Sequence, residues 1–285
     1  MADHDLTGFE QGTFTYEGTE RRVLRRGSGP AVIVIAEIPG ITPKVLEFAD
    51  RVAAIGCTAV LPVLFGRPGR DPHPDARGKL GAAGYVNSSI LKVCVSREFT
   101  VLATGRSSKV VSWLRALAAE EHERCGGPGV GAVGMCLTGG FALAMATDPR
   151  LLAPVLSQPS LPLPVTAGRS RTIDVSPEEL AVVRGRCERE GLQVLGLRFR
   201  GDKFVPEDRF AFLTRQLGDG FVAVELDDDT ANPDSLMPAH SVLTEHLVDS
   251  PGEATRAALD QVLDLFRSRL LDEALPGSAP APGRS

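Results

Sequence analysis

The sequence predicts an α/β fold, a doubly wound and mostly parallel sheet with helices on both faces. Short apolar runs rich in β-branched residues alternate with segments of helical periodicity five or six times along the chain, without internal repeats. The run AVIVIA at residues 31–36 is apolar throughout, which is typical of a parallel strand buried on both faces. With 285 residues, 43% of them hydrophobic, the chain can build a large core.

The predicted strands are short runs bounded by glycine, proline or polar residues. An exposed hairpin segment at residues 13–24 comes first, with Gly18 near its turn. The core strands are predicted at residues 31–36, 57–61, 130–134, 151–156, 193–199 and 221–226.

Helices are predicted where apolar residues recur every three or four positions. One begins at Ser176-Pro177, where serine suits the N-cap and proline the first helical position. The others are predicted at residues 43–55, in a stretch ending near residue 103, and at residues 107–121, 137–147, 206–217 and 253–271. We expect His122 in the polar loop that follows the 107–121 helix.

We expect one domain over residues 1–272 and a flexible Pro/Gly/Ser-rich tail over residues 273–285. The net charge of −5 and the absence of a basic block argue against a nucleic-acid partner. Residues 125–147 carry no charge but contain seven glycines, which favours buried strand and helix over a membrane span. The acidic, polar N-terminus does not resemble a secretory signal.

The five cysteines are odd in number and show no C-x-x-C pair or metal-ligand spacing. This pattern fits a reducing cytoplasm, and it argues against a structural disulfide or a metal site. We expect no cofactor, and a chain that is a monomer or a homodimer.

Residues 130–147, VGAVGMCLTGGFALAMAT, change from a strand-like to a helix-like pattern at Cys136. Cys136 therefore lies at the apex of a strand-to-helix turn, as serine does in the G-x-S-x-G nucleophile elbow. Unpaired N–H groups and the positive end of the helix dipole favour a thiolate at such a place. The alternative is a small buried hydrophobic residue, as most cysteines are.

A nucleophilic cysteine needs a base and a group that orients the base. His240 and His246 follow the last strand, and Asp202 follows the strand before it, in the order nucleophile, acid, histidine. We prefer His240 because it ends the loop, whereas His246 falls in a predicted helical turn. The acids at 227–229 follow the wrong strand and resemble a solvated turn.

Glu37 directly follows the first core strand. Ligands of open α/β sheets bind at the carboxyl ends of strands, and adjacent strands would bring Glu37 to Cys136. A solvated loop acid is the alternative. The loop-rich segments at 62–84 and after Ser157 are expected to shape a substrate mouth.

Four segments together resemble the dienelactone hydrolases, a cysteine-using branch of the α/β-hydrolase fold. They are VIVIAEIPGI from residue 32, GMCLTGG from residue 134, GDKFVP from residue 201 and PAHS from residue 238. The resemblance implies that a small-molecule ester or lactone is hydrolysed through a Cys136-His240-Asp202 triad and a thioester acyl-enzyme.

The resemblance also implies roles for the surrounding residues. Glu37 would hold the resting thiol and help to form the thiolate, and the backbone N–H groups of Ile38 and Leu137 would form the oxyanion hole. Arg97 matches one of two arginines that hold a substrate carboxylate in the namesake enzymes.

Two positions depart from the family pattern. Thr138 stands where the elbow usually has glycine, and Thr244 stands where the second arginine would be. We therefore expect small or medium esters and lactones as substrates, with a modest gain from a substrate carboxylate. The segment 159–189 is also longer than expected and could re-form the pocket.

Two other classes of function stay open. Glutamine amidotransferases also use a G-x-C-x-G elbow, but their histidine is followed two residues later by glutamate, and Val242 stands there in this chain. A non-catalytic α/β-hydrolase-fold binding protein usually lacks a triad member, and all three are present here.

Overall fold

The computed structural model describes residues 6–72, 108–235 and 237–271. Its centre is one eight-stranded sheet with the order β1-β2-β4-β3-β5-β6-β7-β8. The strands are β1 (Glu10–Tyr16), β2 (Thr19–Gly27), β3 (Ala31–Ile35), β4 (Thr58–Pro62), β5 (Val130–Met135), β6 (Leu151–Ser157), β7 (Val194–Phe199) and β8 (Phe221–Leu226).

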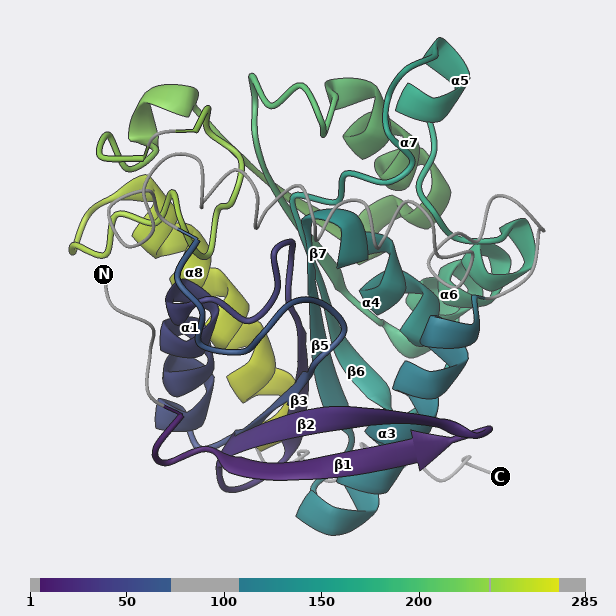
Figure 1. Ribbon diagram of the computed structural model, residues 1–285. Helices are drawn as coiled ribbons and strands as arrows, with labels where there is room; N and C mark the ends of the chain where they lie inside the picture. The colour runs from purple at the N-terminus through teal and green to yellow at the C-terminus, as the bar shows by residue number, and fades with distance from the viewer. Residues whose placement is uncertain (1–5, 73–107, 236, 272–285) are drawn as a thin grey trace, which may run out of the picture.

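Strands β3 to β8 run parallel, and the β1–β2 hairpin joins the edge of the sheet by antiparallel pairing of β2 with β4. The hairpin turns at Gly18, as predicted, and its strands extend beyond the predicted segment on both sides. In Figure 1 the hairpin lies across the lower end of the sheet.

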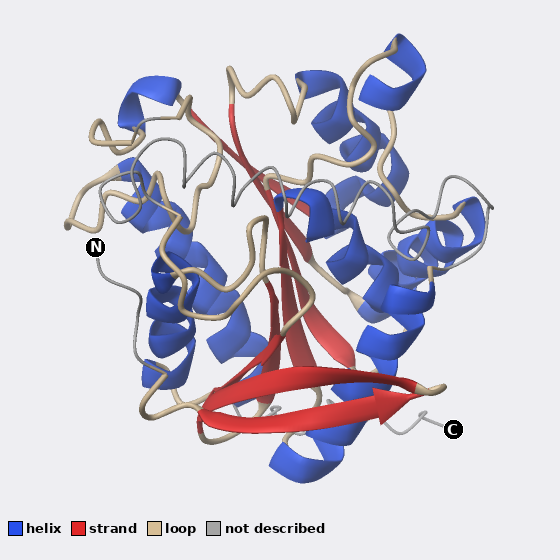
Figure 2. Ribbon diagram, in the orientation of Figure 1, coloured by secondary structure: helices blue, strands red, loops and turns tan. Residues whose placement is uncertain are grey.

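Helices cover both faces of the sheet, so the predicted doubly wound α/β fold is confirmed (Figures 1 and 2). Helices α1 and α8 pack on one face, and α3, α4, α6 and α7 lie on the other. Their bounds are α1 (Pro43–Ala54), α3 (Lys109–Cys125), α4 (Gly139–Met145), α6 (Pro177–Glu190), α7 (Glu207–Leu217) and α8 (Ala254–Phe266).

Strand β3 shows why its sequence has no polar position. Ile33 and Ile35 join the apolar cluster under α3 and α4, whereas Val32 and Val34 join the cluster under α1 and α8. Successive side chains of a strand point to opposite faces, so a strand covered on both faces needs apolar residues throughout.

The strand order reverses direction at β3, near the centre of the sheet. After β3 the chain passes through α1 to β4 on one side of β3, and it later returns to β5 on the other side. Ligands of open α/β sheets bind at such a change of direction, outside the carboxyl ends of the strands. Because β3 pairs with β5 in parallel, the ends of these two strands lie side by side.

Four local predictions need correction or lie outside the described residues. His122 belongs to the last turn of α3 rather than to a loop, because the helix continues to Cys125. A short helix, α5 (Ala167–Ser170), interrupts the predicted proline-rich loop. The helical stretch ending near residue 103 and the tail at 273–285 lie outside the described residues. Within the described ranges, no helix is both long and apolar enough to cross a bilayer.

Candidate active site

Cys136 stands at the apex of a sharp turn between β5 and the 3₁₀ turn η2 (Cys136–Thr138), which leads into α4. Its φ of 54° is in the left-handed region that residues with a side chain rarely adopt. The turn also brings the chain very close to Gly134, where an added Cβ would lie 2.2 Å from the carbonyl oxygen of Thr138. The surrounding packing therefore maintains a strained conformation that presents the sulfur above the sheet.

Thr138, the first departure from the family pattern, is buried beneath the elbow. Its hydroxyl oxygen accepts the N–H of Met135 at 2.8 Å and lies 2.8 Å from the carbonyl oxygen of Ile35, to which it can donate. The threonine thus ties the elbow to the end of β3.

His240 lies between Cys136 and Asp202. One ring nitrogen is within 4.8 Å of the Cys136 sulfur, and Nδ1 is 2.6 Å from a carboxylate oxygen of Asp202. The other oxygen of Asp202 accepts the N–H of Phe204 at 2.9 Å. The Phe204 ring packs edge-on against the imidazole, with ring centroids 5.6 Å apart.

The surroundings of His240 favour its protonated form. Burial alone would lower its pKa, but the hydrogen bond with Asp202 and the nearby Cys136 sulfur outweigh burial and raise the pKa of His240 to about 11. The imidazole is therefore protonated at neutral pH and presents a positive charge beside the Cys136 sulfur. Since the folded-state pKa is the higher one, the stability contributed by this proton is complete below about pH 6.5 and is lost as the pH rises towards about 11.

His246, the other histidine after the last strand, supports the loop that carries His240. Its Nδ1 accepts the backbone N–H groups of Ser241 at 3.1 Å and His240 at 3.4 Å, and its Nε2 is 3.1 Å from the carbonyl oxygen of Met237. Burial lowers the pKa of His246, in keeping with a neutral ring that accepts at Nδ1 and donates at Nε2. His246 is a positioning residue in this arrangement.

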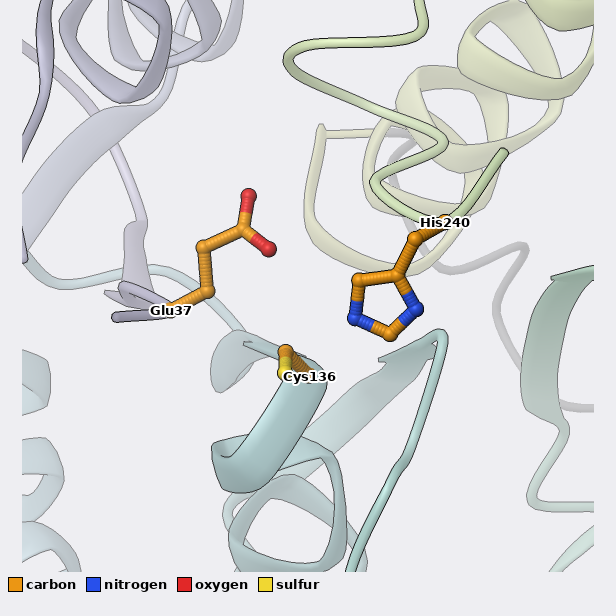
Figure 3. Close-up of side chains that lie close together, drawn as sticks. All are labelled: Glu37, Cys136 and His240. Carbon is orange, nitrogen blue, oxygen red and sulfur yellow. The ribbon is translucent and has the colours of Figure 1, made fainter. Parts of the chain in front are cut away.

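The Glu37 carboxylate is buried at the end of β3 and approaches both Cys136 and His240 to within 4.8 Å (Figure 3). One carboxylate oxygen accepts the hydroxyl of Thr244 at 2.6 Å. The other accepts the hydroxyl of Ser241 at 2.7 Å and the side-chain amide of Gln158 at 3.2 Å. Thr244 thus contributes a neutral donor to Glu37.

Two residues after β6 join the site, and the sequence analysis missed both. Gln158 adopts a φ of 37°, which places its amide beside Glu37. The hydroxyl of the buried Ser160 lies 3.1 Å from the Cys136 sulfur, and its N–H donates to the carbonyl oxygen of Cys136 at 3.0 Å. The polar run Ser157-Gln158-Pro159-Ser160 at a strand end was the available signal.

Arg209 of α7 is fully buried and anchors the loops above the site. Its guanidinium donates to the carbonyl oxygens of Pro159, Pro162, Arg169, Thr172 and Phe204. Burial lowers the pKa of Arg209 to about 10, and it remains charged at neutral pH. One side chain therefore fixes both the start of the long 159–189 segment and the loop between β7 and α7.

The structure brings together four of the residues singled out from the sequence, namely Glu37, Cys136, Asp202 and His240. Leu137 lies in the first turn after β5, where N–H groups have no partner within the helix, and Ile38 lies in the turn after β3. Arg97 lies outside the described residues. Asp227, Asp228 and Asp229 are exposed, as predicted for a solvated turn.

Comparison with solved structures supports the fold. A putative dienelactone hydrolase from Klebsiella pneumoniae subsp. pneumoniae superposes with a TM-score of 0.57 at 16% identity, covering 90% of this chain and 98% of that chain. A dienelactone hydrolase-like promiscuous phosphotriesterase from metagenomic libraries gives a TM-score of 0.58 at 17% identity, covering 92% and 98%. No curated protein sequence matches the chain.

The strand order, the elbow and the structural neighbours define an α/β-hydrolase fold. A sequence model described as the dienelactone hydrolase family matches residues 22–167, just over half of the chain. The protein belongs to the dienelactone hydrolase family and is a hydrolase.

Replacing Asp202 by asparagine should lower the pKa of His240. A charge-assisted hydrogen bond contributes roughly 1.5 to 3 kcal/mol, so its loss corresponds to a fall of about one to two pKa units. NMR titration of the His240 ring protons measures this, with Asp229→Asn as a control that alters an exposed acid. An unchanged His240 titration in Asp202→Asn would show that Asp202 does not hold the imidazolium.

Proposed function

We propose that the protein hydrolyses a carboxylic ester or lactone, with Cys136 as nucleophile, His240 as general acid and base, and Asp202 as the residue that orients His240. The observation that carries the proposal is the chain of contacts from the strained Cys136 through the imidazole to the Asp202 carboxylate, 2.6 Å from Nδ1. A nucleophile, a base within reach and a third group that orients the base are what covalent acyl transfer requires.

In the acylation step, the Cys136 thiolate attacks the carbonyl carbon of the substrate and forms a carbon–sulfur bond. The tetrahedral intermediate collapses as the carbon–oxygen bond to the leaving group breaks. His240 gives its proton to the departing alkoxide, so an alcohol leaves and a thioester remains on Cys136. In a lactone, the same step opens the ring and leaves the hydroxyl on the acyl chain.

Water then hydrolyses the thioester. His240 takes a proton from the attacking water, the carbon–sulfur bond breaks, and the carboxylic acid product leaves while the thiolate and the imidazolium are restored. We assign to the backbone N–H groups of Leu137 and Ile38 the stabilisation of the oxyanion in both steps. Loss of one such donor typically costs roughly a hundredfold to a thousandfold in rate.

We assign Glu37 a supporting role in forming the thiolate, as the family resemblance implies. In this chain Glu37 accepts hydrogen bonds from Gln158, Ser241 and Thr244. These donors compensate the burial of the carboxylate and limit how far it can swing. Glu37 therefore acts from a nearly fixed position beside the sulfur.

Exposed apolar side chains near His240 suit a substrate with apolar groups. Phe204 is 52% exposed although its ring packs on His240, and Met237, three residues before His240, is 66% exposed. Thr244 offers no positive charge and is engaged with Glu37. We propose small or medium esters and lactones as substrates, with a modest gain from a carboxylate.

A reducing compartment such as the cytoplasm suits this chemistry, because a catalytic thiolate must escape oxidation. Four cysteines of the described ranges, Cys57, Cys125, Cys136 and Cys187, are free. We propose a cytoplasmic enzyme on this ground.

Replacing Cys136 by alanine should abolish hydrolysis of esters and lactones, and His240→Ala should be nearly as damaging. Hydrolysis of a chromogenic ester panel measures the rates. Cys187→Ser and His122→Ala change the same residue types outside the site and should retain the parent rate. Full activity in Cys136→Ala would rule out the assignment.

Carboxylated lactones should be hydrolysed with a catalytic efficiency within about tenfold of that for matched neutral lactones. A charge-assisted hydrogen bond contributes roughly 1.5 to 3 kcal/mol, so the missing second cation corresponds to a loss of about tenfold to more than a hundredfold in carboxylate preference. The comparison is made in the parent and in Arg97→Ala. A strong carboxylate preference that survives Arg97→Ala would contradict this account of the pocket.

A further inference from the structure

We propose that Glu37, Cys136 and His240 also form a binding site for a thiophilic divalent metal ion, with Zn²⁺ as the best match, and that the bound ion reversibly inhibits the enzyme. The inhibitory part rests on the proposed function, because the metal would bind the same sulfur and imidazole nitrogen that carry out hydrolysis. The metal-binding part rests on the geometry of the three side chains alone.

The three potential ligand atoms are close enough to share one ion. The carboxylate oxygen, the sulfur and the imidazole nitrogen all lie within 4.8 Å of one another (Figure 3). Any three atoms at such separations have a common point within about 2.8 Å of each of them. Zinc bonds to these atom types are about 2.0 to 2.3 Å long, so each ligand needs to move inward by less than about 1 Å. Small side-chain rotations accomplish this.

The residues that hydrogen-bond to His240 and Glu37 are already arranged as such partners are around metal ligands. Metal-bound histidines usually donate their other ring N–H to a carboxylate, which fixes the tautomer, and His240 Nδ1 makes this contact with Asp202 at 2.6 Å. The Glu37 oxygen that accepts from Thr244 retains a second lone pair for a metal. Both ligands are thus oriented before an ion arrives.

The kinds of donor select the kind of ion. One thiolate, one imidazole and one carboxylate suit Zn²⁺, whereas Mg²⁺ and Ca²⁺ require shells made of oxygen. Water would complete four-coordination, as it does at other zinc sites with three protein ligands. The Cys136–His240 pair carries one proton at neutral pH, on the imidazole. Metal binding needs both atoms deprotonated, so one proton is released.

A bound ion would occupy the sulfur lone pair that attacks the substrate and the nitrogen that moves the proton. Hydrolysis should therefore stop completely at saturating Zn²⁺ and return when a chelator removes the ion. The inhibited fraction should follow the occupancy of a single site on each chain.

Cobalt(II) is the probe that separates binding from activity, because a cobalt–thiolate bond gives a near-ultraviolet charge-transfer band. The metal-free full-length protein should bind one Co²⁺ per chain and develop this band, and Zn²⁺ should displace the cobalt. Cys136→Ser should remove the band, and Glu37→Gln should weaken cobalt binding by at least about tenfold, the loss that removal of even an outer-shell partner of a metal ligand typically causes. Cys187→Ser should keep both the band and the affinity.

Retention of the band in Cys136→Ser, or parent affinity for cobalt in Glu37→Gln, would overturn the proposed site. Failure of the proposed function gives a different result, namely a normal cobalt titration in a protein that hydrolyses no ester. Zinc inhibition of an active enzyme that persists undiminished in Glu37→Gln would overturn the link between this site and inhibition.

Discussion

The parallel pairing of β3 with β5 is the constraint on which the rest of the site depends. The chain must cross to β4 and back before it enters β5. Two residues that are 99 positions apart in sequence, Glu37 and Cys136, therefore meet at the carboxyl ends of two neighbouring strands. Glu37 lies just after the end of β3, and Cys136 directly follows β5. Asp202 follows β7, and the loop that carries His240 follows β8. The parallel arrangement of the strands therefore brings groups from four strand ends to the same end of the sheet.

The buried Glu37 carboxylate is held in place by polar side chains from two loops. A buried carboxylate is costly unless it is hydrogen-bonded, and here donors come from three positions, Gln158, Ser241 and Thr244. The same bonds tie the loop after β6 to the loop that carries His240. A neutral threonine in place of a second cation therefore changes both the substrate preference that we expect and the freedom of Glu37.

Much of this arrangement could be predicted from the sequence, because short local patterns of apolar, glycine and polar residues indicate where each strand ends. The apolar run at 31–36, the elbow around Cys136 and the order of Asp202 and His240 predicted the fold and the residues that meet. Arg209 escaped prediction because a buried arginine inside an amphipathic helix resembles a solvated one until its carbonyl partners are known. Ser160 escaped for a similar reason, since its contact with Cys136 depends on how the chain turns after β6.

Ser160 also defines the sharpest test of the central claim that the sulfur of Cys136 carries the acyl group. Its hydroxyl lies 3.1 Å from that sulfur, so a serine ester is the nearest chemical alternative to a thioester. The decisive measurement is peptide-level mass spectrometry after the protein is quenched during turnover of esters and lactones. The account predicts an acyl mass increment on Cys136 that hydroxylamine removes. An acyl group on Ser160, or turnover without any adduct on Cys136, would contradict it.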